Sequence, residues 1–303
     1  MAAGRKTSIA RVAAFFAALL VLPASAGAQG VTVTSGVVYG EAPVGLPQPG
    51  QAKLLMDLYR PRPTTGLRRP AVVVIHGGGF VQGKRTDSGV VRTARALAER
   101  GIVAASIDYR LQGQAPVPAA RMARMKKALG YREFGPGNAR ASAVTAATED
   151  ALTSLRYLRT NAARLGVRTS RFGVIGSSAG AVIADNIGYA AANYGIASPR
   201  LRFVASLWGG LIVPSPGGRP PAENLRRGDP ALFLVHGDGD EVVSVRLSDE
   251  MDARARAQRV PVEYYRIAGG GHGWNGSGFF KRPTADGQTI FERMLDYAAA
   301  RLR

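Results

Sequence analysis

The chain has 303 residues, of which 46% are hydrophobic, and it carries 40 lysines and arginines against 21 aspartates and glutamates, a formal net charge of +19. It contains no cysteine, which excludes disulfides, thiol catalysis, cysteine-ligated zinc and a lipid-anchored N-terminal cysteine. The basic residues are scattered without a run of five like charges, so we interpret them as a solvated surface and expect no nucleic-acid partner.

Residues 1–28 have the pattern of an export signal. Three basic residues precede the apolar run Val12–Leu22, and the small residues of 24–28 then form an A-x-A-like site. We predict cleavage after Ala28, with Ala26 as the alternative. An uncleaved anchor is disfavoured because a spanning helix needs roughly 20 apolar residues. No second long apolar run follows, so we expect a secreted or periplasmic protein without a membrane span in the mature chain.

Residues 29–303 are expected to form one α/β domain. Two edge strands come first, at Val31–Tyr39 and Leu54–Tyr59, and a Pro/Gly-rich stretch separates them. Short apolar runs then alternate with helical patterns, which predicts a mostly parallel, doubly wound sheet with flanking helices. The predicted strands are Ala71–Ile75, Ile102–Ile107, Phe172–Ile175, Phe203–Leu207, Ala231–Val235 and Val262–Ile267. The predicted helices are Val90–Arg100, Ala143–Leu165, Ala179–Asn193, Val245–Arg259 and Thr289–Leu302.

Residues 111–140 interrupt this alternation. They contain Pro116, Pro118 and Pro136, and they form too long a segment for an ordinary connection between a strand and a helix. We interpret the segment as an insertion. Its length leaves two roles open: a cover over the mouth of the site that shapes substrate choice, with or without movement as a lid, or a simple surface excursion.

The sequence Gly176-Ser177-Ser178-Ala179-Gly180 fits the pattern G-x-S-x-G, with Ser178 at its centre. In this motif the serine lies on a sharp strand-to-helix turn, and the chain can turn so tightly only with small residues two positions away on either side. An apolar strand leads into the motif and a helical pattern leads out of it. We therefore predict Ser178 as a nucleophile; the alternative is a glycine-rich turn that only packs a helix on the sheet.

The sequence HGGGF at 76–80 follows the first central strand. Consecutive glycines let a backbone approach a substrate closely and turn its N–H groups toward it. An oxyanion hole needs such donors, so we assign this role to the backbone N–H groups of Gly77, Gly78 and Ala179. We expect His76 to brace the loop. A phosphate-binding loop is disfavoured because the chain shows neither a Walker lysine nor a G-x-G-x-x-G order there.

Taken together, these motifs make the chain resemble the α/β-hydrolase superfamily, particularly the esterases and lipases with an HGGG oxyanion loop, the hormone-sensitive-lipase and carboxylesterase-like groups. They follow the superfamily's order of serine, acid and histidine over nearly the whole mature chain. The resemblance is specific for the superfamily and much less so for the substrate. The matching stretches are HGGGF at 76–80, DYR at 108–110, GSSAG at 176–180, HGDGDEVV at 236–243 and GGGHGW at 269–274.

The resemblance implies an acid after the next-to-last strand and a histidine after the last one. Asp240 fits the family pattern H-G-x-x-D-x-x-V, whereas Asp238 lies two positions early. His272, on a glycine-rich loop, is predicted as the base that Asp240 orients. His236 ends a buried strand and is expected to be structural. The alternatives are that both aspartates are turn residues and that His272 is a surface histidine.

The implied reaction is hydrolysis of a carboxylic ester through an acyl-enzyme, with Ser178 as nucleophile, His272 as general base and Asp240 as its orienting acid. We expect neither a metal nor an organic cofactor. Small acyl esters and acylated polysaccharides are the expected substrates. Phe80 and Trp274 either contact acyl or aryl groups of the substrate or serve only for packing.

Two other functions are weighed against this one. A serine peptidase of the prolyl-oligopeptidase type shares the motif order, but the HGGG loop favours esters, and the region before Ala71 is too short for that family's β-propeller. A non-catalytic binding protein on the same fold is disfavoured because all three candidates for the triad are present.

Overall fold

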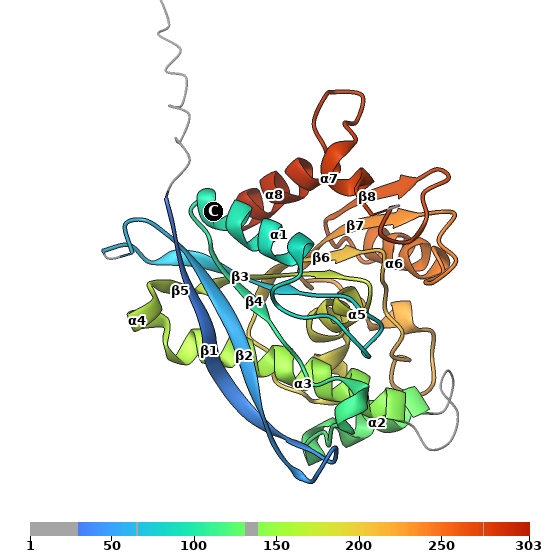
Figure 1. Ribbon diagram of the computed structural model, residues 1–303. Helices are drawn as coiled ribbons and strands as arrows, with labels where there is room; N and C mark the ends of the chain where they lie inside the picture. The colour runs from blue at the N-terminus through green and yellow to red at the C-terminus, as the bar shows by residue number, and fades with distance from the viewer. Residues whose placement is uncertain (1–29, 65, 131–138, 275) are drawn as a thin grey trace, which may run out of the picture.

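The computed structural model describes residues 30–64, 66–130, 139–274 and 276–303. The predicted signal and its cleavage site therefore lie outside the described residues. Within those ranges the strands form one eight-stranded sheet in the order β1-β2-β4-β3-β5-β6-β7-β8 (Figure 1). The strands are β1 (Val31–Val44), β2 (Gly50–Pro61), β3 (Arg69–Ile75), β4 (Val103–Ile107), β5 (Val167–Ser177), β6 (Leu201–Leu207), β7 (Ala231–Gly237) and β8 (Val262–Ile267).

The sheet is parallel from β4 to β8 and antiparallel only where β1 pairs with β2 and β2 with β4. Apolar side chains on both faces explain why the central strands are continuous apolar runs. In β3, Val73 packs into one core layer and Val72 and Val74 into the other, because successive side chains of a strand point to opposite faces. The predicted fold class, a mostly parallel α/β sheet of the α/β-hydrolase type, is confirmed.

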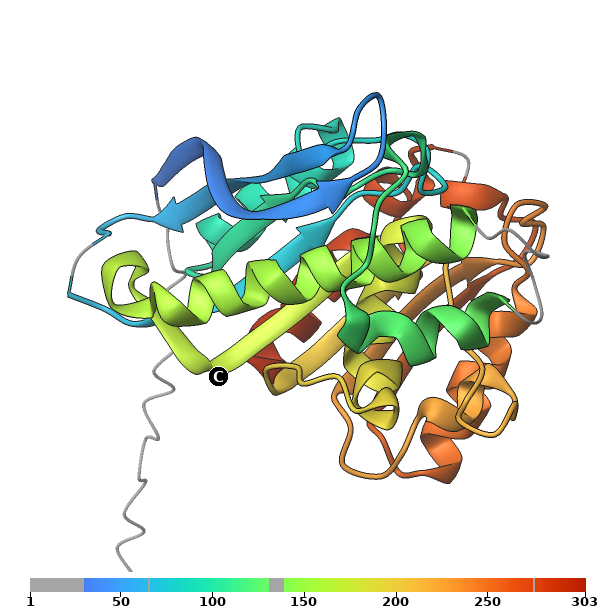
Figure 2. The same ribbon diagram turned by 90° about the horizontal axis from the view of Figure 1, so that it is seen from below.

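Helices cover both faces of the sheet (Figures 1 and 2). The helices α1 (Ser88–Glu99) and α8 (Ile290–Arg301) pack on one face, together with the short α7 (Gly278–Lys281). The other face carries α3 (Ala139–Thr160), α5 (Ala179–Asp185) and α6 (Arg246–Ala257). A single helix was expected over 179–193, but α5 ends at Asp185 and continues as a π turn and then a 3₁₀ turn, η3 (Asn186–Ala190) and η4 (Ala191–Tyr194).

The described part of the predicted insertion is folded rather than open. It contains η1 (Gln112–Gln114), η2 (Ala120–Met122) and α2 (Ala123–Gly130), and α3 already begins at Ala139. Two apolar side chains of α2, together with Met122 just before it, are buried in the core, so the segment packs on the body of the protein. Residues 131–138 lie outside the described ranges. The other short elements are α4 (Ala162–Leu165), η5 (Pro221–Asn224) and η6 (His272–Trp274).

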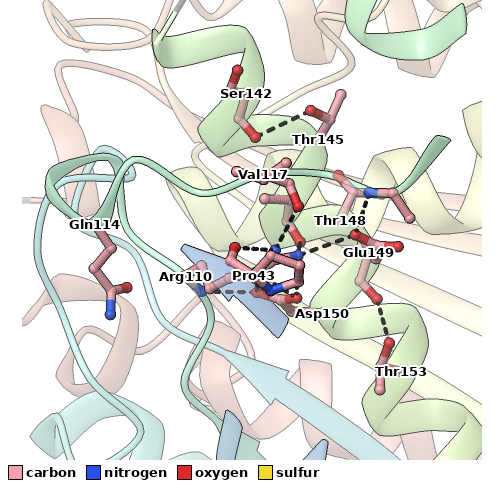
Figure 3. Close-up of polar contacts among 12 residues, drawn as sticks. Pro43, Arg110, Gln114, Val117, Ser142, Thr145, Thr148, Glu149, Asp150 and Thr153 are labelled. Carbon is pink, nitrogen blue, oxygen red and sulfur yellow. Dashed lines mark hydrogen bonds and ion pairs between the residues drawn. The ribbon is translucent and has the colours of Figure 1, made fainter. Parts of the chain in front are cut away.

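A buried ion-pair cluster fastens the insertion to the sheet and to α3 (Figure 3). Arg110 is 1% exposed and donates to Asp150 at 2.8 Å and to Glu149 at 3.1 Å. Its guanidinium also donates to the carbonyls of Pro43, near the end of β1, and of Val117, in the insertion, at 3.0 Å each. One arginine of the DYR stretch thus joins three segments that are far apart in the sequence.

Candidate active site

The predicted nucleophile lies on a strained turn between β5 and α5. Ser178 has φ 53° and ψ −120°, a conformation that costs energy for any residue with a side chain. A Cβ on Gly176 would lie 2.0 Å from the carbonyl oxygen of Gly180, and a Cβ on Gly180 would lie 2.3 Å from that of Ile75. Only glycine fits at either position, so the steric reason that led to Ser178 holds in the structure.

Three predicted side chains meet at the carboxyl ends of the strands. His272 lies in η6 after β8, and its Nε2 is 2.9 Å from Oγ of Ser178. Its Nδ1 is 2.7 Å from Oδ2 of Asp240, which follows β7. Since a carboxylate accepts only, Nδ1–H donates to Asp240, and Nε2 is left to accept the Ser178 hydroxyl proton. The structure thus joins residues 178, 240 and 272 in one hydrogen-bond chain.

The structure also distinguishes the two candidate acids. The side chain of Asp240 is fully buried, and its Oδ1 accepts the N–H groups of Val242 and Val243 at 2.8 and 2.9 Å. Desolvation alone would raise the pKa of Asp240, but the hydrogen bonds from Val243, His272 and Val242 outweigh it and lower that pKa. Asp238 instead accepts from the Gly269 N–H at 2.6 Å, so it holds the turn that precedes His272.

His236 is buried, as expected for a structural residue, and it also contacts Asp240. The ring is fully buried, Ser248 donates to its Nδ1 at 2.7 Å, and its Nε2 lies 3.0 Å from the Val243 carbonyl and 3.2 Å from Oδ2 of Asp240. Desolvation lowers the pKa of His236, so the ring stays neutral and donates through Nε2. The sequence indicated that His236 is buried. Its contact with Asp240, four residues later in the chain, was not predicted.

The glycine loop lies against Ser178. A Cβ on Gly77 would be 3.1 Å from the Cβ of Ser178. Gly78 has φ 104°, and a Cβ there would lie 2.1 Å from the Gln82 carbonyl oxygen. In the described part of the chain, the N–H groups of Gly77 and Gly78 donate to no other group. Ala179 is the first residue of α5, where a helix leaves its N–H groups unpaired.

The loop is braced from beneath by two stacked rings. His76 is 1% exposed and donates from Nδ1 to the Gly77 carbonyl at 2.7 Å, in agreement with its expected bracing role. The ring centroids of His76 and Tyr109 are 4.2 Å apart with an interplanar angle of 14°. The Tyr109 hydroxyl lies 3.1 Å from the Gly77 carbonyl oxygen and 3.2 Å from that of His76. Sequence reasoning noted DYR only as a motif and missed these contacts.

A cavity of about 460 Å³ opens beside the glycine loop and Ser177. Among the described side chains, its aromatic lining comes from Trp208, Phe279 and Phe280, and Phe80 is not part of it. Phe80 is only 3% exposed and packs near Tyr109, so its expected alternative role in packing is the one the structure supports. The side chain of Trp274 lies outside the described part.

Two further features bear on ligands and membranes. Across the ranges that the structure describes, no group of three or more His, Asp or Glu side chains is arranged to hold a metal ion. Over the same ranges, no helix has both the length and the apolar character that crossing a bilayer requires.

Comparisons with known proteins agree with this arrangement. A family profile described as "alpha/beta hydrolase fold" matches residues 139–224, and one described as "BD-FAE" matches residues 56–133. The apo form of Thermogutta terrifontis esterase 2 superposes with a TM-score of 0.62 over 92% of this chain and 95% of that chain, at 21% sequence identity. The chain has the α/β-hydrolase fold.

Two curated relatives of this chain come from Mycobacterium tuberculosis. Esterase LipI is 30% identical over 143 residues, 46% of this chain, and carboxylesterase NlhH is 32% identical over 111 residues, 37% of this chain. These matches cover 36% of LipI and 26% of NlhH, so the chain spans well under two thirds of either relative. Both relatives are named for ester hydrolysis, which accords with the geometry of the site.

Proposed function

We propose that this α/β hydrolase is an exported carboxylic ester hydrolase that acts through Ser178, His272 and Asp240. The observation that carries the proposal is the continuous hydrogen-bond chain from Oγ of Ser178 to His272, at 2.9 Å, and from His272 to Asp240, at 2.7 Å. A serine hydroxyl is a poor nucleophile by itself, and an adjacent base held by a carboxylate is what activates it.

In the proposed reaction, His272 Nε2 takes the proton of Ser178 as Oγ attacks the ester carbonyl carbon. The tetrahedral intermediate collapses, the C–O bond to the alcohol breaks, and the alcohol leaves with the proton from His272. Water then gives its proton to His272 and attacks the acyl-enzyme, which releases the acid and restores Ser178. Asp240 stabilises the imidazolium in both steps and keeps the ring in the required tautomer.

The negative charge that develops on the carbonyl oxygen needs donors that are already in place. We assign this role to the N–H groups of Gly77, Gly78 and Ala179, because Gly77 lies against Ser178 and Ala179 follows it in the chain. The loss of one such donor typically costs about 2.7–4 kcal/mol in the transition state. A loop of three glycines can approach the oxygen without a side chain in the way.

The substrate class follows from the cavity and from the names of the relatives. A volume of about 460 Å³ with an aromatic wall has room for the acyl or the alcohol part of a small ester. Gly77, Gly78 and Ser177 line this cavity, whereas Ser178 and His272 do not, so the group it would hold is one that lies beyond the glycine loop from the reacting carbonyl. We propose small acyl esters, or acyl groups on a polysaccharide, as substrates.

Export is proposed on the sequence pattern of residues 1–28 alone. Expression of the full chain in a bacterial host, followed by N-terminal sequencing of the protein outside the cytoplasm, tests it. The expected first residue is Gln29. A protein that stays in the cytoplasm with its N-terminus intact would contradict the proposal.

The activity is tested with p-nitrophenyl esters of increasing acyl length, beside acetylated xylan and feruloyl esters. Wild type is compared with Ser178→Ala and with Ser170→Ala, which changes an exposed serine at the other end of β5. We expect Ser178→Ala to lose at least about a thousandfold in turnover with unchanged circular dichroism, and Ser170→Ala to lose nothing. Hydrolysis of peptides but not of esters would favour the peptidase, and full activity of Ser178→Ala would exclude the proposed mechanism.

A further inference from the structure

The backbone of the glycine loop must point its N–H groups toward the substrate, and the described contacts show what fixes that direction. Each peptide unit is planar and trans, so its C=O and its N–H point in opposite directions. The carbonyl of Gly77 and the N–H of Gly78 belong to one such unit. The carbonyl of His76 and the N–H of Gly77 belong to the unit before it. Whatever holds the two carbonyls therefore also aims the two N–H groups.

One hydroxyl lies within hydrogen-bond distance of both carbonyls. Oη of Tyr109 is 3.1 Å from the carbonyl oxygen of Gly77 and 3.2 Å from that of His76. Tyr109 is 4% exposed, and burial raises the pKa of its hydroxyl, so the group remains a donor throughout the physiological pH range. The imidazole of His76 donates to the Gly77 carbonyl as well, at 2.7 Å, but makes no hydrogen bond to its own carbonyl.

The opposite side of the loop faces the site. Gly77 and Gly78 both line the cavity beside Ser177, and the Cα of Gly77 lies so close to Ser178 that only a hydrogen fits between them comfortably. With both carbonyls turned to Tyr109, the two N–H groups turn away from its hydroxyl, toward the side on which Gly77 lies against Ser178. Because these residues are glycines, either peptide unit could rotate at little steric cost once its carbonyl lost its hydrogen bond.

We propose that Tyr109 is a positioning residue for the oxyanion hole: the single proton of its hydroxyl is shared between the carbonyls of His76 and Gly77, which holds both of them and thereby aims the N–H groups of Gly77 and Gly78 at the developing oxyanion. The inference rests on the proposed ester hydrolysis. Because the N–H groups act most strongly on the charged intermediate, loss of the hydroxyl affects the transition state more than substrate binding.

The test variant is Tyr109→Phe, which keeps the ring stacked on His76 and removes only the hydroxyl. The matched control is Tyr297→Phe, since the hydroxyl of Tyr297 donates to the Leu232 carbonyl at 3.0 Å and its ring is also buried, far from the loop. Two quantities are measured on the preferred p-nitrophenyl ester: kcat and KM by initial rates, and the inhibition constant of a trifluoromethyl ketone analogue, which forms a tetrahedral adduct. Melting temperatures are recorded for every variant.

We expect Tyr109→Phe to lower kcat by about ten- to a hundredfold. This is less than the effect of removing one oxyanion-hole N–H group completely, because His76 still donates to the carbonyl of Gly77. KM should change less than about twofold, and the inhibition constant of the analogue should rise by the same factor as kcat/KM falls. Tyr297→Phe should change neither quantity.

The proposal is overturned if Tyr109→Phe keeps its kcat, if KM rises while the affinity for the analogue is unchanged, or if Tyr297→Phe loses as much activity at an equal loss of melting temperature. A wild-type protein that hydrolyses no ester would remove the proposed function itself, and the positioning role with it. An active wild type beside an unaffected Tyr109→Phe would remove only the positioning role.

Discussion

Replacing Arg110 by methionine removes the only guanidinium that contacts Asp150 in the described part of the chain (Figure 3). Asp150 has no exposed surface, so in the variant its carboxylate would lie buried without a counter-ion. Loss of one partner of a buried ion pair is strongly destabilising for this reason, typically by about 3–5 kcal/mol. In the variant the carbonyls of Pro43 and Val117 also lose their hydrogen bond from the guanidinium, and each loss should lower the free energy of unfolding by about 1 kcal/mol.

The pH dependence of this loss can be worked out. Burial raises the pKa of Asp150 and the guanidinium of Arg110 opposes that shift, so without the guanidinium the carboxyl takes up a proton in the folded state. Holding a carboxyl protonated when its unfolded-state pKa is near 3.9 costs about 1.4 kcal/mol per pH unit, hence about 4 kcal/mol at pH 7 and about 1.5 kcal/mol at pH 5. In the variant, the pKa of Asp150 is higher in the folded state than in the unfolded state. The loss of stability therefore grows as the pH rises above the unfolded-state pKa.

Urea denaturation of Arg110→Met and wild type at pH 5 and pH 7 measures both values. Arg121→Met is the matched control, because Arg121 is 44% exposed and its pair with Glu149 should contribute less than about 1 kcal/mol at either pH. Adding Asp150→Asn to Arg110→Met should abolish the pH-dependent part. An equal loss at both pH values, or a loss below about 1 kcal/mol at pH 7, would refute this reasoning.

Two further predictions concern the acid and the buried histidines. Asp240→Asn removes the carboxylate that fixes the tautomer of His272, so kcat on the preferred ester should fall by about ten-thousandfold, whereas Asp238→Asn should stay within about tenfold; equal losses would contradict the assignment. Burial lowers the pKa of His236 and of His76, so below about pH 6.5 the unfolded chain binds protons that the folded chain does not. As the pH is lowered below this value, the free energy of unfolding should therefore decrease by up to about 1.4 kcal/mol per pH unit for each ring. A free energy of unfolding that stays constant in urea denaturation from pH 7.5 to pH 5 would contradict this.

The parts of the fold that could be predicted are those in which a local pattern decides the structure. The central strands are apolar runs because both of their faces are buried, and the helices between them were recognised by their periodicity. Pairing between distant segments leaves no such pattern. The start of β5 at Val167 is an example, because the four polar residues 168–171 separate Val167 from the apolar run, and Val167 joins the sheet by pairing with Arg69 of β3.

The same distinction holds for the site. Ser178, Asp240 and His272 each follow a strand and stand in a recognisable motif, so the structure brings together residues that could be named in advance. Of the two side chains that brace the loop, His76 was predicted but Tyr109 could not be, since its role depends on a contact with residues 32 and 33 positions away. The aromatic wall of the cavity was missed because Phe279 and Phe280 lie in a short helix with no motif of their own.

Labelling with a fluorophosphonate, followed by mapping of the modified peptide by mass spectrometry, tests the activated serine most directly. The reagent reacts only with a serine whose proton is taken by a working base. One label per chain, on Ser178 and abolished in His272→Ala while that variant remains folded, is the predicted result. A folded wild-type protein that takes up no label, or takes it up on another serine, would contradict the account.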